Sequence, residues 1–337
     1  MNSVKVATLI DERRRRMVDM FGRLSCDSFV SMNPNTSYWL GFGRQDRIVW
    51  DGSEWLTGAR LREEFLGRES MLGYDSRTPA SELLAIPGFE QKCAAYVGRD
   101  VAALRRGKDA LEISLMQVAS NAVSRSVSLA FAHDVDSDST EVDVQFSVHR
   151  RLLESLPSFE WAFDPSVGAG ASSGKLWSAP SMSPIGVGVV ATDFGVKFQG
   201  YCSDRGQTWW VGPRSGSEYE EYRVAEESLN EVLREAVSEI GAGARVSRLT
   251  ERFTSKASNA GLRVISRAQF GHGLGLHLHE SPAIGIESDD VLIEGEVVSL
   301  EPELETASGL RVSTEQPFVV GETTLVPLDE WEAPTLT

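Results

Sequence analysis

The sequence predicts an α+β protein with two domains, a smaller N-terminal α/β domain over residues 1–103 and a larger domain over residues 104–337. The chain has 337 residues, which is more than a typical single domain holds. Strand and helix patterns alternate throughout the smaller domain. After it, two helical patterns followed by strand patterns occur twice, near 104–211 and near 217–320. This repeat predicts a duplicated, pseudo-symmetric larger domain with its functional site at the centre.

Four short elements are expected in the N-terminal domain. Apolar residues recur at helical spacing before Leu24, which predicts a helix. Two short apolar runs, 48–50 and 54–56, flank Asp51 and Gly52, a dipeptide typical of tight β-hairpin turns. In chain order, the expected elements are a helix over 11–24, a strand over 29–32, a turn at 33–35 and the hairpin of 48–50 with 54–56.

The larger domain is expected to begin with two helices and to contain two more after a strand-rich segment. Ser217 and Glu220 have the spacing of a capping box, which predicts the start of the third of these helices. Gly241 and Gly261 follow helical patterns and are typical helix terminators. The expected elements are helices over 104–131, from 138 or 139 to 156, over 217–240 and over 247–260, with strands over 159–211 and after residue 261.

The composition excludes several classes of partner. The chain carries 49 acidic and 33 basic residues, a formal net charge of −16, which repels nucleic-acid phosphates and anionic membrane surfaces. The basic cluster 13–16 is expected on a solvated helix face. No run of about eighteen apolar residues occurs, and the N-terminus lacks the apolar segment of a secretory signal. Cys26, Cys93 and Cys202 are scattered, which indicates a reducing compartment, the cytoplasm, without disulfides or a thiolate metal site.

Residues 271–282 hold three of the five histidines in the chain, His272, His277 and His279. Glycines around them allow a close approach of the backbone, and alternation along a strand can place imidazoles on one face. Such a segment suits a chain that holds neutral imidazole nitrogens at a metal ion. The alternative is a tight barrel turn whose histidines have ordinary hydrogen-bond partners.

Two aspartates lie on either side of an expected hairpin turn at 197–200. In such a hairpin Asp193 and Asp204 would face each other, with Cβ atoms roughly 4.5–5.5 Å apart. Two like charges this close destabilise a hairpin unless a cation lies between them, and the spacing suits a pair of metal ions. The alternative is that Asp193 ends a strand and Asp204 caps a turn, both in contact with solvent.

Two glutamates border apolar strand patterns near the C-terminus. Glu301 directly follows the pattern 297–300, and Glu315 stands just before the pattern 317–320. A carboxylate beside a buried strand is costly unless it is paired or metal-bound. The alternative is that both are edge-strand carboxylates, which are common in so acidic a chain.

The order and local context of these residues resemble the metal-ligand set of the pita-bread family, which contains methionine aminopeptidases, Xaa-Pro aminopeptidases, prolidases and creatinases. The resemblance covers residues 104–325, and residues 13–43 are more weakly similar to the N-terminal domain of the proline-peptidase branch. Three motifs carry it: Asp193-x-Gly195 with Gly200-Tyr201-x-Ser203-Asp204, then Gly271-His272-Gly273-x-Gly275-Leu276-x-x-His279-Glu280-x-Pro282, and finally Ser299-Leu300-Glu301-Pro302 followed by Glu315.

The resemblance implies that the larger domain is a pseudo-symmetric pita-bread catalytic domain with two divalent metal ions. One imidazole and four carboxylates form an oxygen-rich set, which favours Mn, Fe, Co or Zn. The implied ligands are Asp193 on one ion, Asp204 and Glu315 bridging both ions, and His272 with Glu301 on the other.

The activity implied by the resemblance is that of an Xaa-Pro aminopeptidase or dipeptidase, a metal-dependent hydrolase that cleaves the amide bond before proline or a proline-like group. A metal-bridging hydroxide would attack, Glu301 would receive its proton, and His279 would contact the substrate or the developing oxyanion. His277 is expected to line the substrate pocket. Because related two-domain proteins are commonly dimers, a homodimer is implied, with a small peptide or small-molecule substrate and no nucleic-acid or membrane partner.

Three positions depart from the family pattern. Trp177 stands where the peptidases have a histidine, and an indole ring cannot accept a proton. Gln207 replaces the arginine of the family's Thr-Arg-Thr, which removes a positive charge, and residues 313–314 form an apparent extension between Arg311 and Glu315. Trp177 either packs in a peptidase that works without the histidine, or marks a pocket rebuilt for creatinase-like hydrolysis or a lyase reaction on a small non-peptide substrate. A third alternative is a non-catalytic binding module.

Overall fold

The chain divides into two compact units in the computed structural model, Met1–Leu111 and Glu112–Thr337. The structure describes residues 3–24, 26, 28–32, 38, 47–50, 55–57, 71–74, 93–170, 173, 179–265 and 269–329. Within these ranges, no helix is both long enough and apolar enough to span a membrane.

The first unit is built on a mixed five-stranded sheet in the order β3-β2-β1-β4-β5. The hairpin expected before residue 57 is confirmed, because β2 and β3 pair antiparallel with Trp50 opposite Trp55. Strand β1 runs antiparallel to β2 and parallel to β4, which in turn is parallel to β5. The elements are α1 (Ser3–Leu24), β1 (Ser28–Met32), β2 (Arg47–Trp50), β3 (Trp55–Thr57), β4 (Met71–Tyr74), β5 (Cys93–Tyr96) and α4 (Gly98–Arg106). The turn expected at 33–35 lies outside the described residues.

Helix α1 shows that the basic cluster 13–16 is not simply a solvated face. Arg13 is fully buried. Its Nε donates to Asp109 Oδ2 at 2.6 Å and its Nη1 donates to the Tyr38 carbonyl at 2.9 Å, while the guanidinium also lies over the Tyr38 ring. A guanidinium can be buried when it is paired with a carboxylate, so this expectation is corrected for Arg13.

The second unit contains two helices followed by strands, twice over, as the sequence predicts. The first half consists of α5 (Ala110–His133), α6 (Glu141–Ser155), β6 (Glu160–Trp161), β7 (Ser166–Ala169), β8 (Gly188–Phe194), β9 (Val196–Phe198), β10 (Tyr201–Cys202) and β11 (Arg205–Val211). The second half consists of α7 (Ser217–Val237), α8 (Val246–Asn259), β12 (Arg263–Val264), β13 (Gly271–Gly273), β14 (Glu280–Ile284), β15 (Val297–Leu300), β16 (Glu303–Glu305), β17 (Arg311–Ser313), β18 (Gln316–Val320) and β19 (Leu325–Pro327).

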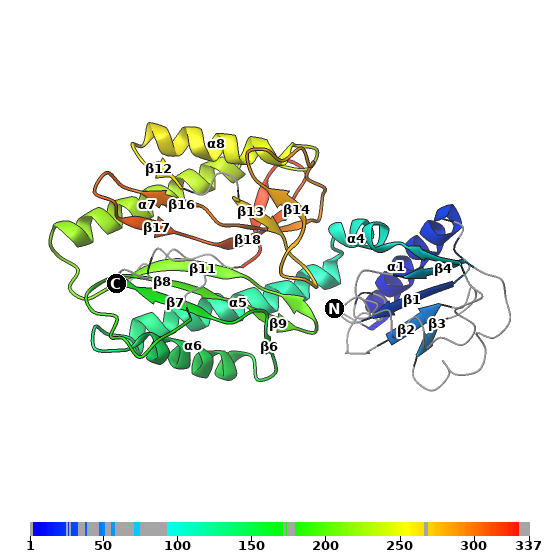
Figure 1. The fold of residues 1–337 in the computed structure, drawn as a ribbon, viewed down its shortest axis with the longest axis horizontal. Coiled ribbons are helices and arrows are strands. Elements are labelled where there is room, and N and C mark those ends of the chain that lie inside the picture. The colour runs from blue at the N-terminus through cyan, green and yellow to red at the C-terminus, as the bar shows by residue number, and fades with distance from the viewer. Residues whose placement is uncertain are drawn as a thin grey trace. The chain divides into compact units, whose positions relative to one another are not determined.

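The strands of this unit lie between two helical layers. Figure 1 shows α5 and α6 on one side of the strands and α7 and α8 on the other. The first half forms the sheets β11-β8-β7 and β10-β9-β6, and the second half forms β14-β13-β15-β18-β19 and β12-β16-β17. This mixture of layers confirms the predicted α+β class.

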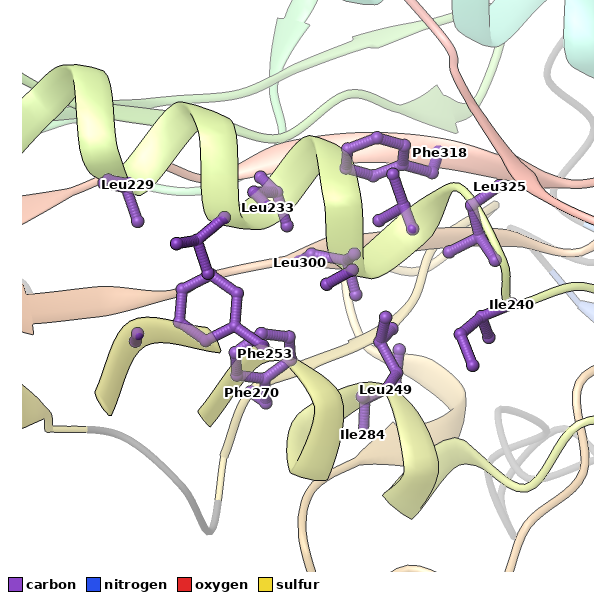
Figure 2. Packing of buried hydrophobic residues seen from close by; sticks show 14 of the residues in the cluster. Leu229, Leu233, Ile240, Leu249, Phe253, Phe270, Ile284, Leu300, Phe318 and Leu325 are labelled. Carbon is purple, nitrogen blue, oxygen red and sulfur yellow. The ribbon is translucent and has the colours of Figure 1, made fainter. Parts of the chain in front are cut away.

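Each half has its own hydrophobic core. One core packs α5 and α6 on the β7–β8–β11 sheet, and the other packs α7 and α8 on the larger sheet. In the second core Phe253 and Phe270 contact each other, with ring centroids 5.0 Å apart, beside Leu249 and Ile284 (Figure 2). Burying each such side chain contributes about 1.5–3 kcal/mol. The cores meet across β11, where Trp209 packs into the first and Trp210 against the second, so these neighbouring side chains point to opposite faces.

Helix boundaries differ from the sequence predictions at several places, and α1 begins at Ser3 instead of residue 11. The helix expected over 104–131 is two helices, because Gly107 adopts an extended conformation and Asp109 Oδ1 accepts from the Leu111 N–H at 2.9 Å. Helix α6 begins at Glu141, with Thr140 as its N-cap. The prediction of a capping box at Ser217 is wrong, since the N-cap of α7 is Gly216 and no side-chain hydrogen bond caps the helix.

Candidate metal centre

The five residues expected to bind metal lie on strands from both halves of the second unit. Asp193 is in β8, Asp204 stands just before β11, and His272 is in β13. Glu301 directly follows β15, and Glu315 directly precedes β18. The pairing of β15 with β18 places Leu300 opposite Gln316, so its continuation by one residue brings Glu301 and Glu315 together.

The register of the first hairpin corrects one expectation. Strands β8 and β11 pair antiparallel as predicted, but Asp193 is opposite Gly206 rather than Asp204. The two-residue turn at Gln199 and Gly200, both with positive φ, joins Phe198 to Tyr201 and is centred one residue later than expected, which shifts the pairing by two residues. Asp204 therefore approaches the Asp193 side chain diagonally, close enough for its charge to raise the pKa of Asp193.

Four of the five side chains converge on one point. Asp204, His272, Glu301 and Glu315 each offer one ligand atom, and these atoms all lie within 4.8 Å of one another. His272 Nε2 is 2.9 Å from Glu301 Oε1 and 3.3 Å from Asp204 Oδ2. Asp204 and His272 are buried. The geometry is therefore that of several negative oxygens around one small volume.

Asp193 completes this acidic cluster. Its Oδ1 is buried and, among the described residues, has no hydrogen-bond partner. Burial raises the pKa of Asp193, and the charges of Asp204 and Glu301 raise it further. Burial likewise raises the pKa of Glu315, and Asp204 and Asp193 add to the effect. Unpaired buried carboxylates that repel one another are costly, and divalent cations would remove that cost, so these residues fit the implied metal ions.

The orientation of His272 suits a metal ligand. Its Nδ1–H donates to the Gly273 carbonyl at 3.0 Å, which leaves Nε2 facing the carboxylates. Burial alone would lower the pKa of His272, but hydrogen bonds and charges from Asp204 and Glu301 raise it to about 10. A backbone carbonyl that fixes the second ring nitrogen is the usual arrangement around histidine ligands.

Small residues make room for the cluster. A Cβ on Gly206 would lie 2.9 Å from both the Cβ and the Oε2 of Glu315. On β13, Gly271 has φ of +154°, and a Cβ there would lie 2.1 Å from the Ser299 carbonyl oxygen. Gly206 and Gly271 are therefore required by the close approach of neighbouring chain segments.

The other two histidines occupy different surroundings. The His279 ring is exposed and meets the His272 ring edge-on, with centroids 4.3 Å apart, so it lies at the solvent side of the cluster. Burial, and to a lesser degree the charge of His272, lowers the pKa of His279. His277 is oriented toward Glu280, whose Oε1 accepts from the His277 backbone N–H at 3.0 Å. Trp177, the expected pocket residue, lies outside the described residues.

Arg205 is a residue of this region that the sequence reasoning missed. The charge expected to be lost at Gln207 is instead present two residues earlier, on a buried guanidinium. Arg205 donates from Nη1 to the Glu315 carbonyl at 3.1 Å and from Nη2 to Gln207 Oε1 at 3.3 Å. The available signal was its position: Arg205 and Gln207 are two apart on β11 and share one face. Arg311, in contrast, lies 3.6 Å from Glu303.

Comparisons with known proteins agree with this geometry. A model of metallopeptidase family M24 matches residues 114–322. A putative Xaa-Pro aminopeptidase of Mycoplasma pneumoniae is 25% identical over 229 residues, which cover 66% of this chain but only 63% of the relative, less than two thirds of its length. The uncharacterized peptidase YqhT of Bacillus subtilis is 24% identical over 353 residues, covering 91% of this chain and 94% of the relative.

The fold is also shared with a solved structure. A recombinant prolidase from Thermococcus sibiricus superposes with a TM-score of 0.77 at 21% identity and covers 96% of this chain and 98% of its own. At that identity the likeness establishes the fold, and it confirms the α+β pita-bread architecture implied by the sequence motifs.

Proposed function

The chain belongs to metallopeptidase family M24, and on that premise we propose that it is a metal-dependent hydrolase that cleaves the amide bond before proline or a proline-like group. The observation that carries the proposal is the convergence of Asp204, His272, Glu301 and Glu315 within 4.8 Å, beside the unpartnered buried Oδ1 of Asp193. Relatives named as Xaa-Pro peptidases support the choice of substrate class.

The donor set indicates which residues would hold the metal ions. We assign Asp193 to one ion and His272 with Glu301 to the other, with Asp204 and Glu315 shared between them. Four carboxylates and one imidazole favour Mn, Fe, Co or Zn. Two such ions would supply a water molecule acidified enough to be a nucleophile near neutral pH.

The remaining chemistry belongs to this chain's own side chains. Glu301 is only partly buried, so its carboxylate can accept a proton at the solvent side of the cluster. The lowered pKa of His279 keeps its imidazole neutral near pH 7, so Nε2 or Nδ1 can donate one hydrogen bond to a substrate carbonyl. His277, oriented by Glu280, would line the approach to the cluster.

Metal analysis and a substrate panel test the proposal. Protein purified without added ions is expected to contain close to two transition-metal ions per chain. With Mn(II) or Co(II), it should hydrolyse Xaa-Pro dipeptides or Xaa-Pro tripeptides faster than the matched Xaa-Ala peptides. A loaded site that turns over none of these peptides would favour the creatinase-like or lyase alternative, and a chain that binds no metal would favour the binding module.

The variant Asp204→Asn tests the role of the metal centre in activity while the fold is kept. The amide removes one negative charge from the cluster and cannot bridge two cations, so activity should fall by about a thousandfold or more while the circular dichroism spectrum is unchanged. The matched control is Asp290→Asn, an exposed aspartate of the same unit, which should retain activity. Wild-type turnover in Asp204→Asn would contradict the shared-ligand assignment.

Two further proposals rest on the resemblance. We propose that residues 1–103 form a creatinase-like N-terminal domain and residues 104–337 the catalytic domain, and that the protein is a homodimer. Light scattering of the purified protein measures the mass in solution, and the mass of one chain alone would contradict the dimer.

A further inference from the structure

A polar cavity lies apart from the metal centre, between α5 and the face of the β7–β8–β11 sheet on which α5 packs. Its volume is about 380 Å³. Thr192, Arg205, Gln207 and Trp209 line it from the sheet, and alternation along the strands directs Asp193 and Asp204 to the other face. The cavity and the metal centre are therefore separated by the thickness of the sheet.

The cavity is lined on the sheet side by the buried guanidinium of Arg205, which has more N–H groups than it has hydrogen bonds to the protein. Arg205 is 7% exposed. Its two hydrogen bonds, to the Glu315 carbonyl and to Gln207 Oε1, use two of its five N–H groups, and within the described ranges the other three have no protein acceptor. Because Arg205 lines the cavity, these three N–H groups are available to a ligand with acceptor oxygens or to ordered water.

Asp329 is the only acidic residue among the described lining residues, and both of its carboxylate oxygens accept hydrogen bonds from other side chains. Asp329 accepts from Gln316 Nε2 at 3.1 Å on one oxygen and from the Ser124 hydroxyl on the other. It forms no ion pair with Arg205 at 4.0 Å or less. Space therefore remains between these two opposite charges.

The charges on the cavity wall select the ligand. Arg205 and Asp329 balance each other, and Arg125, which is exposed on α5, adds one positive charge. A monoanion neutralises this excess, whereas a dianion such as phosphate would leave a negative charge uncompensated in a partly buried site. Trp209, Val127 and Leu129 supply an apolar wall.

We propose that this cavity is a binding site for a small organic monocarboxylate with an apolar body. The carboxylate oxygens accept hydrogen bonds from the free N–H groups of Arg205, with Arg125 as the second positive charge. Guanidinium and carboxylate form the paired geometry that fixes such ligands most strongly. The apolar part of the ligand packs against Trp209. A cavity of this size is in the range of small-molecule sites.

Benzoate is a suitable probe, because it combines a single carboxylate with a flat apolar ring. Isothermal titration calorimetry on the metal-loaded full chain is expected to show one saturable benzoate site per chain. The same site should persist after chelation of the metal ions, which distinguishes it from benzoate bound at the metal centre. Benzamide, which has the same shape without the charge, should bind at least about tenfold more weakly. Equal binding of benzamide would overturn the carboxylate assignment.

Two arginine variants locate the site. Arg205→Gln is expected to weaken benzoate binding about tenfold or more, and Arg125→Gln a few-fold, because the second arginine is exposed and screened by solvent. The matched control is Arg248→Gln, an exposed arginine on α8 on the opposite helical layer, which should bind benzoate as the wild type does.

A thermal melt of each variant shows whether it is folded, and Arg125→Gln, an exposed position, remains informative if Arg205→Gln does not fold. No benzoate binding to the wild type, or equal binding to wild type and Arg125→Gln, would overturn the proposal. Either result leaves the peptidase assignment untouched, because that assignment is tested by turnover and metal content.

Discussion

Gly206 illustrates how one missing side chain shapes the metal centre. Because a Cβ there would lie 2.9 Å from two atoms of Glu315, Gly206→Ala must displace the Glu315 carboxylate or the strand that holds it. We expect the free energy of unfolding to fall by about 1–3 kcal/mol, as for other overpacked sites, and metal affinity to fall with it. Metal content after dialysis and a thermal melt measure the two effects.

Gly22 is the control for this substitution. It lies in α1, and a Cβ added there meets nothing within 4 Å. Gly22→Ala should therefore keep its metal and gain up to about 1 kcal/mol of helix stability. If Gly206→Ala retained full metal content after dialysis, Glu315 would not be held where the structure places it.

Protonation of the cluster makes metal binding dependent on pH. The pKa of His272 is raised to about 10, so its imidazole carries a proton at pH 7 in the metal-free protein. The raised pKa values of Asp193 and Glu315 favour bound protons there as well. Metal ligation requires the deprotonated forms, so loading at pH 7 should release about one proton or more per chain, and affinity should rise with pH.

Calorimetric titration with Mn(II) in buffers of different ionisation enthalpy measures this proton release. Metal affinity that does not change between about pH 6 and 8 would contradict the protonated state of His272 in the metal-free protein.

At this scale the sequence predicted that the five candidate ligand residues come together, because each stands in a recognisable local context beside an apolar strand; four of them converge within 4.8 Å and Asp193 lies beside them. It did not predict that Asp193 pairs with Gly206, since the register depends on where the hairpin turn is centred, and the turn at Gln199 and Gly200 lies one residue later than expected. It also missed the buried Arg205, because burial of a charge depends on tertiary partners such as the Glu315 carbonyl.

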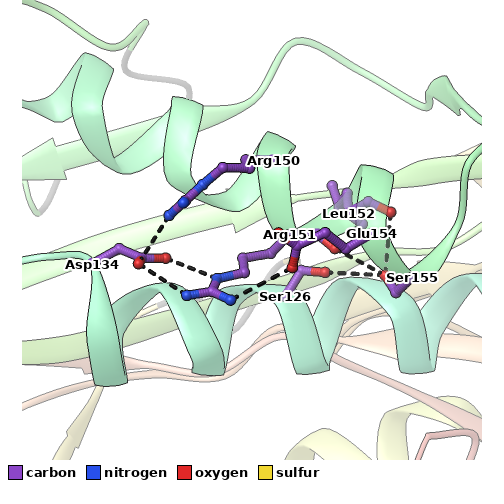
Figure 3. A network of polar contacts seen from close by, with 7 residues as sticks. All are labelled: Ser126, Asp134, Arg150, Arg151, Leu152, Glu154 and Ser155. Atoms are coloured by element: carbon purple, nitrogen blue, oxygen red, sulfur yellow. Dashed lines mark hydrogen bonds and ion pairs between the residues drawn. The ribbon is translucent and has the colours of Figure 1, made fainter.

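At the scale of elements, an ion-pair clamp joins the end of α5 to α6. Asp134 Oδ2 accepts from Arg151 Nε and Oδ1 from Arg151 Nη2, both at 2.9 Å, and Arg150 Nη2 lies 2.9 Å from Oδ1 (Figure 3). The hydrogen bond from Arg151 is the main reason that the pKa of Asp134 is lowered. A paired contact of this kind fixes the angle between two helices that cover the first core.

Asp134→Asn should reduce the free energy of unfolding by at most about 1 kcal/mol near neutral pH. Because the folded-state pKa is depressed, the stabilisation is present above the unfolded pKa of about 3.9 and is lost as the pH falls through the folded value. The difference in melting temperature between wild type and variant should therefore be constant from about pH 5 to 7 and shrink below about pH 4. If the difference in melting temperature grew as the pH fell, the ion pair between Asp134 and Arg151 would not be the source of the stabilisation.

The elements themselves were largely predictable, and their ends were not. Periodicity placed α8 within a residue at each end, and Gly261, with φ of +78°, follows it as expected. The end of α4 at Gly107 was missed because apolar spacing continues on both sides of the break. Thr140 caps α6 in preference to Asp138 or Ser139, because both of those residues bond instead to Asp136.

At the scale of the whole second unit, the two halves carry separate cores but share one cluster of candidate metal ligands. Asp193 and Asp204 come from the first half, and the other three candidate residues come from the second. Without cations, burial raises the pKa values of Asp193 and Glu315, and the charges of carboxylates from the other half raise them further, so the carboxylates repel one another across the boundary between the halves. Bound cations would reverse this repulsion and link the two halves. Such a contribution belongs to the assembled unit and to no single element.

Removal of the metal should therefore lower the thermal stability of this unit as a whole. Any ion that binds only the folded state stabilises it by RT ln(1 + [M]/Kd), about 2.7 kcal/mol when the free ion is at 100 times Kd. Differential scanning calorimetry of the loaded and chelated protein should show a higher transition temperature for the loaded form. Asp204→Asn should lose most of this metal-dependent shift, while Asp290→Asn should keep it. A transition that is the same with and without metal would mean that the two halves are held together by their strands and cores alone, and that the acidic cluster does not bind ions across them.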